Sequence, residues 1–452
     1  MPAIEQRGQL IRSMESLTDL FLDACKEPSQ WRIGVESEKF GIHAATGAPL
    51  KYDSPDGIKA LLAWMCKKRD WSPALDSASG AIIALTRGQT SLTLEPGGQV
   101  ELSGAPAHCV HDVCREMSGH LEELAPIAQA LDIRWLALGF HPTAKQQDLA
   151  WVPKERYAIM REYLPTRGSR ALDMMRRTCT VQVNMDFASE ADAMRKLRVA
   201  LKLQPIATAM FANSPFLEGQ FTGARSQRAR VWLDVDPDRC GLLPFAWKEE
   251  ATFRDYAEWA LDVPMFFFKR GTQMFRNTGQ RFRAFLADGF EGERATFDDW
   301  ELHLSTLFPE VRLKNTIEVR GADAQGSQLI CAVPALWKGL LYDTNALNEA
   351  ESLVKDLQHD TVAEARAAIA EQALSADLRG RSVRAWAEAM IDIALRGLER
   401  QNGCTHSHSD ERRFLAPLQR LVEHGHCPAD VLLAHIDTQK PLLAQLLDKA
   451  SA

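Results

Sequence analysis

Two acidic side chains stand two positions apart in a stretch that otherwise reads as a β-strand. The stretch is WRIGVESEKFGI, residues 31–42, and the two carboxylates are Glu36 and Glu38. Side chains alternate between the faces of a strand, so both carboxylates lie on one face, roughly 6.6 Å apart. Like charges at this spacing repel each other unless water or a cation lies between them. The pattern therefore predicts either a solvated edge strand or a site that binds cations.

Three further stretches, SLTLEPGGQVELS, TVQVNMDF and NTIEVRG, carry apolar residues on one face and polar residues on the other. Their polar positions include Glu95, Glu101, Gln182, Asn184, Glu318 and Arg320. An antiparallel sheet that packs its apolar face on helices collects such positions on its opposite face. If that face curves into a cup, the five glutamates meet.

Five glutamates in one concavity cost a large free energy unless divalent cations neutralise them. Oxygen ligands without a nearby His or Cys pair favour Mg²⁺ or Mn²⁺ over zinc. Magnesium usually keeps coordination positions open for substrate phosphates, so such a cup suits ATP without a P-loop, and no P-loop motif occurs here. The alternative is an ordinary amphipathic sheet with an acidic exposed face, and spacing alone leaves both interpretations open.

The elements that must position these residues are strands and helices without a repeated βαβ order. Helical spacing marks residues 8–26, 56–69, 107–131, 153–164 and 189–212, and strand patterns mark 81–103, 133–140, 178–187 and 312–323. Beyond residue 323 the chain is almost wholly helical, with amphipathic segments near 328–342, 360–374, 382–402 and 410–425. We therefore predict one α+β domain over residues 1–452 with a helical C-terminal extension.

The amino-acid composition argues against several classes of protein. The chain has 452 residues, of which 46% are hydrophobic and 25% charged, as in a soluble globular protein. Its net charge of −7 and the lack of a Lys/Arg block argue against a nucleic-acid partner. No apolar run is long enough to span a membrane, and the first residues contain no signal-peptide core, so we expect a cytoplasmic protein. The nine cysteines contain no C-x-x-C motif, which argues against a zinc cage.

The plant-type glutamate–cysteine ligases, found in plants and proteobacteria, resemble this chain in seven motifs. These motifs run in order from about residue 30 to 345: WRIGVESEKFGI, LEPGGQVELSGAP, MRRTCTVQVNMDF, LQPIATAMFANSPFLEG, ALDVPM, FPEVRLKNTIEVRGAD and LWKGLLYD. The resemblance implies a glutamine synthetase-like α+β fold, in which a curved antiparallel sheet packed with helices forms a cup. It implies a catalytic core over about residues 30–345 and a helical extension over about 346–452.

The activity that the resemblance implies is ATP-dependent ligation of the γ-carboxylate of L-glutamate to the amine of L-cysteine. The expected intermediate is γ-glutamyl phosphate, and the product, γ-glutamylcysteine, begins glutathione biosynthesis. Two alternatives are a ligase of the same fold that uses another amine acceptor and a catalytically silent nucleotide-binding regulator. We expect a monomer or homodimer that acts on small-molecule substrates, without nucleic acid or membrane.

The resemblance also assigns roles to single residues. The implied Mg²⁺ ligands are Glu36, Glu38, Glu95, Glu101 and Glu318, and the implied cofactor-binding residues are Gln182, Asn184 and Arg320. The implied substrate-binding residues are Arg156, Arg228, Trp232 and Phe266, with Arg228 and Arg320 as catalytic residues. An arginine fork suits carboxylates and phosphates because two parallel N–H bonds match two oxygens. Taken alone, each arginine better fits a surface salt bridge, and Trp232 better fits core packing.

Two departures from the family bear on substrate choice and regulation. Phe266 stands where plant relatives carry a tyrosine near the cysteine substrate, so the recognition of the acceptor lacks that hydroxyl. Asn277 and Gly292 occupy the positions of the plant enzymes' second regulatory cysteine pair.

Cys114 and Cys331 match the family's other cysteine pair, which forms a disulfide. That match implies an enzyme that senses oxidation, and the alternative is two buried free thiols.

In THSHSDE, His406 and His408 fit either a metal site or, far more often in such a polar loop, solvated side chains.

Overall fold

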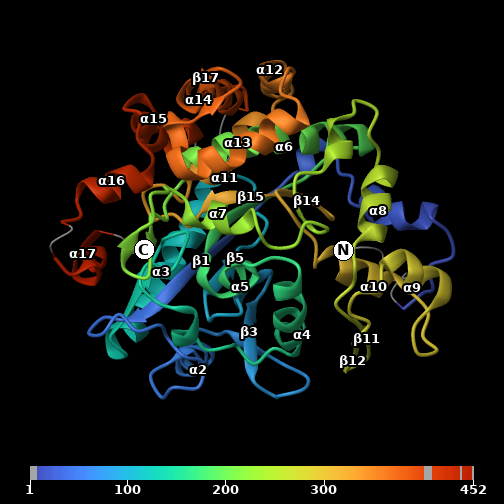
Figure 1. Ribbon diagram of the computed structural model, residues 1–452, viewed down its shortest axis with the longest axis horizontal. Helices are drawn as coiled ribbons and strands as arrows, with labels where there is room; N and C mark the ends of the chain where they lie inside the picture. Colours follow the sequence, from blue (N-terminus) through green and yellow to red (C-terminus); the bar gives the residue numbers. More distant parts are fainter. Residues whose placement is uncertain (1–7, 402–409, 438–439, 450–452) are drawn as a thin grey trace.

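A nine-stranded antiparallel sheet forms the centre of the molecule (Figure 1). The computed structural model describes residues 8–401, 410–437 and 440–449. The strands of this sheet are β1 Ile33–His43, β2 Ser72–Leu75, β3 Ile82–Arg87, β4 Thr90–Leu94, β5 Val100–Ser103, β6 Ile133–Leu136, β7 Thr180–Met185, β14 Val311–Leu313 and β15 Ile317–Asp323. Their order is β14-β15-β7-β1-β5-β4-β3-β2, and β6 pairs with the end of β1.

The alternation of side chains on β1 separates an apolar face from a polar face. Ile33, Val35 and Ser37 are buried, and the two β-branched residues also favour the strand conformation. Glu36 and Glu38 lie on the opposite face. The predicted division of this strand into two faces is therefore present in the structure.

Three long helices pack against the sheet: α3 (Val110–Ala130), α6 (Glu190–Met210) and α11 (Ala332–Leu341). Helix α6 begins at Ser189, whose side chain accepts a hydrogen bond from Asp192 N at 3.2 Å. It is buried along most of its length, because the sheet lies on one side and the C-terminal helices lie on the other. In Figure 1, α6, α11, α13 and α14 gather along the upper side of the view.

The C-terminal helices, except the last, share the main hydrophobic core with the sheet. They are α12 Thr344–Val354, α13 His359–Gln372, α14 Val383–Arg400, α15 Ala416–Glu423, α16 Pro428–Ala434 and α17 Leu442–Lys449. Helix α14 packs on α11 and α12, and the core cluster runs from Ile11 to Ala429. Within the described ranges, no helix is both long and apolar enough to cross a membrane.

Shorter elements surround this frame. The helices are α1 Asp19–Leu22, α2 Ile58–Lys68, α4 Glu155–Tyr163, α5 Ala171–Arg177, α7 Gln227–Trp232, α8 Phe253–Asp262, α9 Phe282–Asp288 and α10 Phe297–Leu304. The small strand pairs are β8 Phe216–Leu217 with β9 Gln220–Phe221, β10 Cys240–Gly241 with β13 Phe308–Pro309, β11 Phe268–Arg270 with β12 Gln273–Phe275, and β16 Asp377–Leu378 with β17 Arg381–Ser382.

The N-terminal segment departs from the helix expected over residues 8–26. Only a 3₁₀ turn, Glu15–Thr18, and the single-turn α1 are helical there. Ile11 N donates to Ala295 O at 3.1 Å, so backbone pairing with a distant segment takes the place of helical hydrogen bonds. Tertiary contacts overrule local propensity at this position.

Helices α8 and α10 were not among the expected elements, although the sequence contains their start signals. Each begins with a capping box, formed by Thr252 with Asp255 in α8 and by Thr296 with Asp299 in α10. In such a box the hydroxyl and the carboxylate each satisfy an unpaired backbone N–H group.

Candidate active site

Carboxylates on neighbouring strands meet on the polar face of the sheet. The antiparallel register of β1 and β5 sets Glu38 directly opposite Glu101. On the other side of β1, Glu36 lies opposite Gln182 of β7. Directly opposed side chains point to the same face and have Cβ atoms about 4.5–5.5 Å apart. We call Glu36, Glu38, Glu95, Glu101 and Glu318 together the acidic cup.

Glu95 joins the acidic cup through the turn between β4 and β5. Gly98 N donates to Glu95 O and Glu95 N donates to Gln99 O, each at 2.9 Å. Gly98 has a φ of +88°, which glycine adopts without steric cost. At Gly97 a Cβ atom would lie 2.4 Å from Arg176 O, so only glycine fits there. The PGG sequence thus explains how the chain returns Glu95 beside Glu101.

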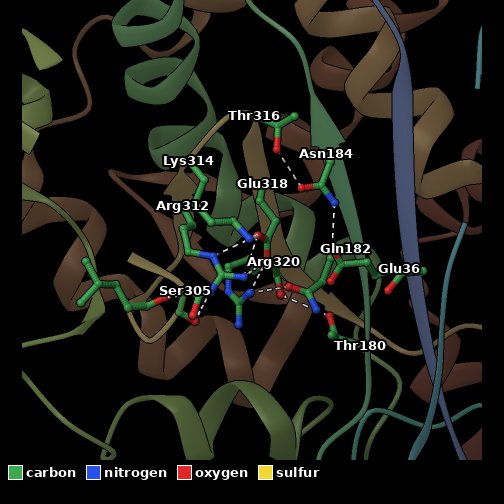
Figure 2. A network of polar contacts seen from close by, with 12 residues as sticks. Glu36, Thr180, Gln182, Asn184, Ser305, Arg312, Lys314, Thr316, Glu318 and Arg320 are labelled. Carbon is green, nitrogen blue, oxygen red and sulfur yellow. Dashed lines mark hydrogen bonds and ion pairs between the residues drawn. The ribbon is translucent and has the colours of Figure 1, made fainter. Parts of the chain in front are cut away.

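Glu318, on β15, is surrounded by cations (Figure 2). Arg312 lies opposite it on β14 and donates from Nε to Oε2 and from Nη2 to Oε1, both at 2.9 Å. Arg320 also donates to Oε1, and Lys314 Nζ lies 3.5 Å from Oε2. Burial opposes the ionisation of Glu318, but these cations together hold its pKa below its usual range. This end of the acidic cup is neutralised by protein groups.

The other end of the acidic cup has less compensation. Burial, with repulsion from Glu318 and Glu101, raises the pKa of Glu36 to about 7. Burial and the neighbouring Glu95 raise the pKa of Glu101 to about 7. Burial, with Glu95 and Glu101, also raises the pKa of Glu38 well above its usual value. These carboxylates therefore hold their protons more tightly than exposed glutamates do.

Neutral donors bind the carboxylates at this end. The bonds are Asn184 Nδ2 to Glu36 (2.9 Å), Thr180 N to Glu38 (3.0 Å) and Ser103 Oγ to Glu101 (2.8 Å). Across the described part of the chain, no group of three or more His, Cys, Asp or Glu side chains is arranged to hold a metal ion. The donor set is nevertheless all oxygen and short of positive charge, and both properties fit a hard divalent cation.

Arg228, Trp232 and Arg320 come together at one side of the cup. They line a cavity of about 40 Å³ with Phe308 and Glu310. Arg228 Nη2 donates to Arg320 O at 2.8 Å, and Arg320 Nη1 donates to Gln182 Oε1. Two guanidinium groups and an aromatic wall are suited to an anionic group on a substrate.

Arg156 and Phe266 lie in different surroundings. Arg156, on α4, has a buried Nε atom without a hydrogen-bond partner, and its Cζ lies 5.5 Å from the centre of the Tyr157 ring. Phe266 is 1% exposed, with Arg239 Cζ 3.9 Å from its ring centre. Phe266 is thus a packed core residue in this structure, whereas Arg156 has one buried donor without a hydrogen-bond partner.

Three cations beside the acidic cup were not predicted from the sequence: Arg312, Lys314 and Lys154. Lys154 Nζ donates to Leu94 O at 2.7 Å, immediately before Glu95. Burial lowers the pKa of Lys154 to about 8, against the opposing influence of Glu95. Pairing of LKNTIEV as a tight hairpin would have set Arg312 opposite Glu318, but nothing local links Lys154 to the β4–β5 turn.

Cys114, on α3, and Cys331, at the start of α11, are joined by a disulfide with a Cα–Cα distance of 5.8 Å. The bond ties two helices that both pack against β1. His406 and His408 lie outside the described residues.

Known proteins resemble this chain in sequence and in fold. The family model described as glutamate–cysteine ligase family 2 matches residues 32–448. The chloroplastic glutamate–cysteine ligase of Brassica juncea is 43% identical over 422 residues, covering 93% of this chain and 80% of that protein. The Arabidopsis thaliana enzyme is 42% identical, with 93% and 79% covered. The chloroplastic ligase B of Oryza sativa subsp. japonica is 40% identical, with 97% and 87% covered.

A solved structure shares the fold. The glutamate–cysteine ligase of Francisella tularensis, in complex with AMP, aligns with a TM-score of 0.58 and 13% identity, covering 93% of this chain and 87% of that one. The predicted α+β, glutamine synthetase-like fold is confirmed.

The expected cytoplasmic location is wrong by the same comparison. The relatives in plants are named as chloroplastic enzymes. The expected location relied on the lack of an apolar signal-peptide core, a feature that bears on secretion alone. Plastid transit peptides are amphipathic and rich in Ser and Arg, so the lack of such a core does not distinguish the cytoplasm from a plastid.

Proposed function

This chain belongs to glutamate–cysteine ligase family 2, and we propose that the acidic cup is its active site. The enzyme is an ATP-dependent glutamate–cysteine ligase, which produces γ-glutamylcysteine. The observation that supports the acidic cup most strongly is the pairing of Glu38 with Glu101 in a buried place with little compensating charge. Buried like charges are costly unless a positively charged ligand joins them.

We assign Mg²⁺ or Mn²⁺ to the five glutamates of the acidic cup. Glu38, Glu95 and Glu101 are expected to hold the ions most firmly, because Glu318 already forms ion pairs with Arg312 and Arg320. Ions held there would offset the negative charge of the ATP phosphates and of the transferred phosphoryl group.

The arginines and amides beside the acidic cup are assigned to the substrates. Arg320, Gln182 and Asn184 lie on adjacent strands and are proposed to contact the nucleotide. Arg228, Trp232 and Arg156 are proposed to bind the amino-acid substrates, and Phe266, which is buried, is proposed to shape the acceptor pocket through packing. Arg228 and Arg320 supply N–H donors to the charge that develops on the transferred phosphoryl group, which makes them the proposed catalytic residues.

No protein nucleophile is needed for the reaction. The γ-carboxylate oxygen of glutamate attacks the γ-phosphorus of ATP, the bond to the bridging oxygen breaks, and ADP leaves. The amine of cysteine then attacks the acyl carbon of γ-glutamyl phosphate, the amine loses a proton, and phosphate leaves. The role of the protein is to hold the two reacting groups in line and to stabilise charge.

The proposal also covers the domain organisation, the oligomeric state and the redox sensitivity of the enzyme. We propose that residues 1–452 form one catalytic domain, with a core over about 30–345 and a helical extension over about 346–452, because the main hydrophobic core contains residues of both parts. We also propose that the enzyme acts as a monomer or homodimer on small molecules. The disulfide between Cys114 and Cys331 makes its activity sensitive to reduction.

The second candidate is a γ-glutamyl ligase that uses another amine, and it is favoured by Phe266 in place of a tyrosine. The test is phosphate release with ATP and glutamate fixed and the acceptor varied. We expect cysteine to give the largest kcat/KM, with 2-aminobutyrate as the matched acceptor that lacks the thiol. A strong preference for a different amine supports the second candidate, and no phosphate release with any amine rejects both.

A further inference from the structure

Asp323, the last residue of β15, is a fully buried carboxylate. Its Oδ2 atom accepts hydrogen bonds from Asn213 N at 2.8 Å and from Ser214 Oγ at 2.6 Å. Its Oδ1 atom accepts from Ser226 Oγ at 2.9 Å. Gly139 packs so closely that a Cβ atom there would lie 2.2 Å from Asp323 Cγ. The three hydrogen-bond donors and the close backbone of Gly139 therefore hold the Asp323 carboxylate in one orientation.

The two serines bound to Asp323 hold the first turn of α7. Ser214 Oγ accepts from Arg228 N at 3.2 Å. Ser226 is the N-cap of α7, and its Oγ accepts from Ala229 N at 3.0 Å. Helix α7 has six residues, which is too short for a helix to be stable by itself. These bonds therefore help to fix its direction, together with its packing on α5 and α13.

Arg228 extends from this first turn into the cavity beside the acidic cup. Its Nη1 atom lies 3.9 Å from Asp323 Oδ1, and its Nη2 atom donates to Arg320 O at 2.8 Å. A buried guanidinium is stable only with an anion nearby. The Asp323 carboxylate supplies the negative charge beside Arg228. A guanidinium has five N–H donors, so this arrangement fixes Arg228 while leaving donors for a substrate anion.

We propose that Asp323 is a positioning residue for the ligase reaction, which fixes the Arg228 guanidinium through Ser214, Ser226 and its own charge. The inference rests on the active site proposed above. Asp323 is enclosed by protein and does not touch substrate, so its whole effect passes through α7 and Arg228.

The test compares Asp323→Asn with a matched control, Asp299→Asn. Asp299 is also buried, accepts from Thr296 N at 2.9 Å and from Thr296 Oγ1 at 2.8 Å, and pairs with Arg270 at 2.8 Å. The chemical change and the number of disturbed bonds are thus similar, but the control lies at the start of α10. A general loss of stability affects both variants alike.

We expect Asp323→Asn to raise the KM for glutamate by about tenfold or more, with less than about a threefold change in the control. Arg228→Lys should raise the same KM, and the double variant should be no more than about twofold worse than Arg228→Lys alone, since both changes remove one function. Hydrogen exchange of the amides of residues 227–232 should become faster in Asp323→Asn and stay unchanged in the control.

Additive effects of the two substitutions, or unchanged exchange in α7, would overturn the proposal. If the wild-type protein makes no dipeptide, the proposed function fails, and the exchange measurement still decides whether Asp323 orders α7. If Asp323→Asn does not fold, Ser214→Ala and Ser226→Ala, which keep the carboxylate, take its place with the same expected direction in KM and exchange.

Discussion

Glu38 of β1 lies directly opposite Glu101 of β5, on the face of the sheet that also carries Glu36. Like charges at directly opposed positions destabilise an antiparallel pair. A fold selected for stability alone would not keep them, so we expect that stability is lost at this pair for the sake of function.

Replacing Glu38 by glutamine is expected to leave the metal-free protein equally stable or more stable, because the substitution removes repulsion with Glu101. Activity should nevertheless fall by roughly a hundredfold, as when a catalytic ion is misplaced. Thermal melting with EDTA and initial rates with Mg²⁺ are the two measurements. A variant that is clearly less stable and fully active would remove Glu38 from the proposed ligand set.

Glu318→Gln should behave differently, since this carboxylate already neutralises Arg312 and Arg320. Breaking a buried ion pair on one side typically costs roughly 3–5 kcal/mol, because the remaining charge is left without a partner. We expect urea unfolding of the metal-free variant to reveal a loss of this order. Arg312→Met combined with Glu318→Gln should recover part of it, and a stability equal to the wild type in Glu318→Gln would contradict the described pairing.

Two buried histidines predict how stability changes with pH. Burial, with Arg177 nearby, lowers the pKa of His141 to about 3, and burial also lowers that of His303 to about 3. Both folded-state values lie below the ordinary value of 6.5, so the folded protein binds fewer protons than the unfolded chain. Their contribution to stability is present above pH 6.5 and is lost as the pH falls.

His141→Asn isolates one of these contributions. His141 Nδ1 accepts from Ala144 N at 3.0 Å, and the Asn oxygen can accept the same bond without taking up a proton. The difference in unfolding free energy between pH 6.5 and pH 5 should shrink by about 2 kcal/mol in this variant. An unchanged difference in urea titrations would show that His141 does not titrate on unfolding.

Reduction of the disulfide between Cys114 and Cys331 is expected to lower both the melting temperature and the activity. The bond joins residues 217 positions apart in the sequence. In the chain-entropy model, closing such a loop stabilises the folded state by about 5 kcal/mol. Glu411 provides a second link between the same helices, since it accepts from Val110 N at 2.6 Å and pairs with Lys338. The reduced protein should therefore remain folded.

Scanning fluorimetry with and without dithiothreitol measures this effect, and Cys114→Ser, which should not respond to dithiothreitol, is the control. Peptide mapping of the non-reduced protein should recover the two cysteines as one crosslinked pair. Free thiols at both positions under oxidising conditions would end the redox proposal.

The strands of the acidic cup were predictable because a period of two is a local property of the sequence. Glu101 and Glu318 each lie between two buried apolar neighbours, and Glu36 and Glu38 follow the alternation that begins with Ile33 and Val35, which assigns their face without knowledge of the fold. The fold class followed from the same patterns together with the long helical C-terminal part.

Contacts between distant segments were not predictable in this way. Lys154 reaches Leu94 O from α4, and Asp323 binds serines on two separate loops, although no spacing in the sequence relates these residues. The same limit explains the N-terminal segment, where the pairing of Ile11 with Ala295 replaced an expected helix. Such pairings depend on the tertiary fold and not on local propensity.

The most direct test of the central claim follows oxygen from glutamate to phosphate. The wild-type protein is supplied with ATP, Mg²⁺, cysteine and glutamate that carries ¹⁸O in its γ-carboxylate, and both products are analysed by mass spectrometry. If the carboxylate attacks ATP to form γ-glutamyl phosphate, each released phosphate carries one ¹⁸O atom and one γ-glutamylcysteine forms for each ADP. Unlabelled phosphate beside the dipeptide, or the absence of dipeptide with Mg²⁺ present, would contradict the account.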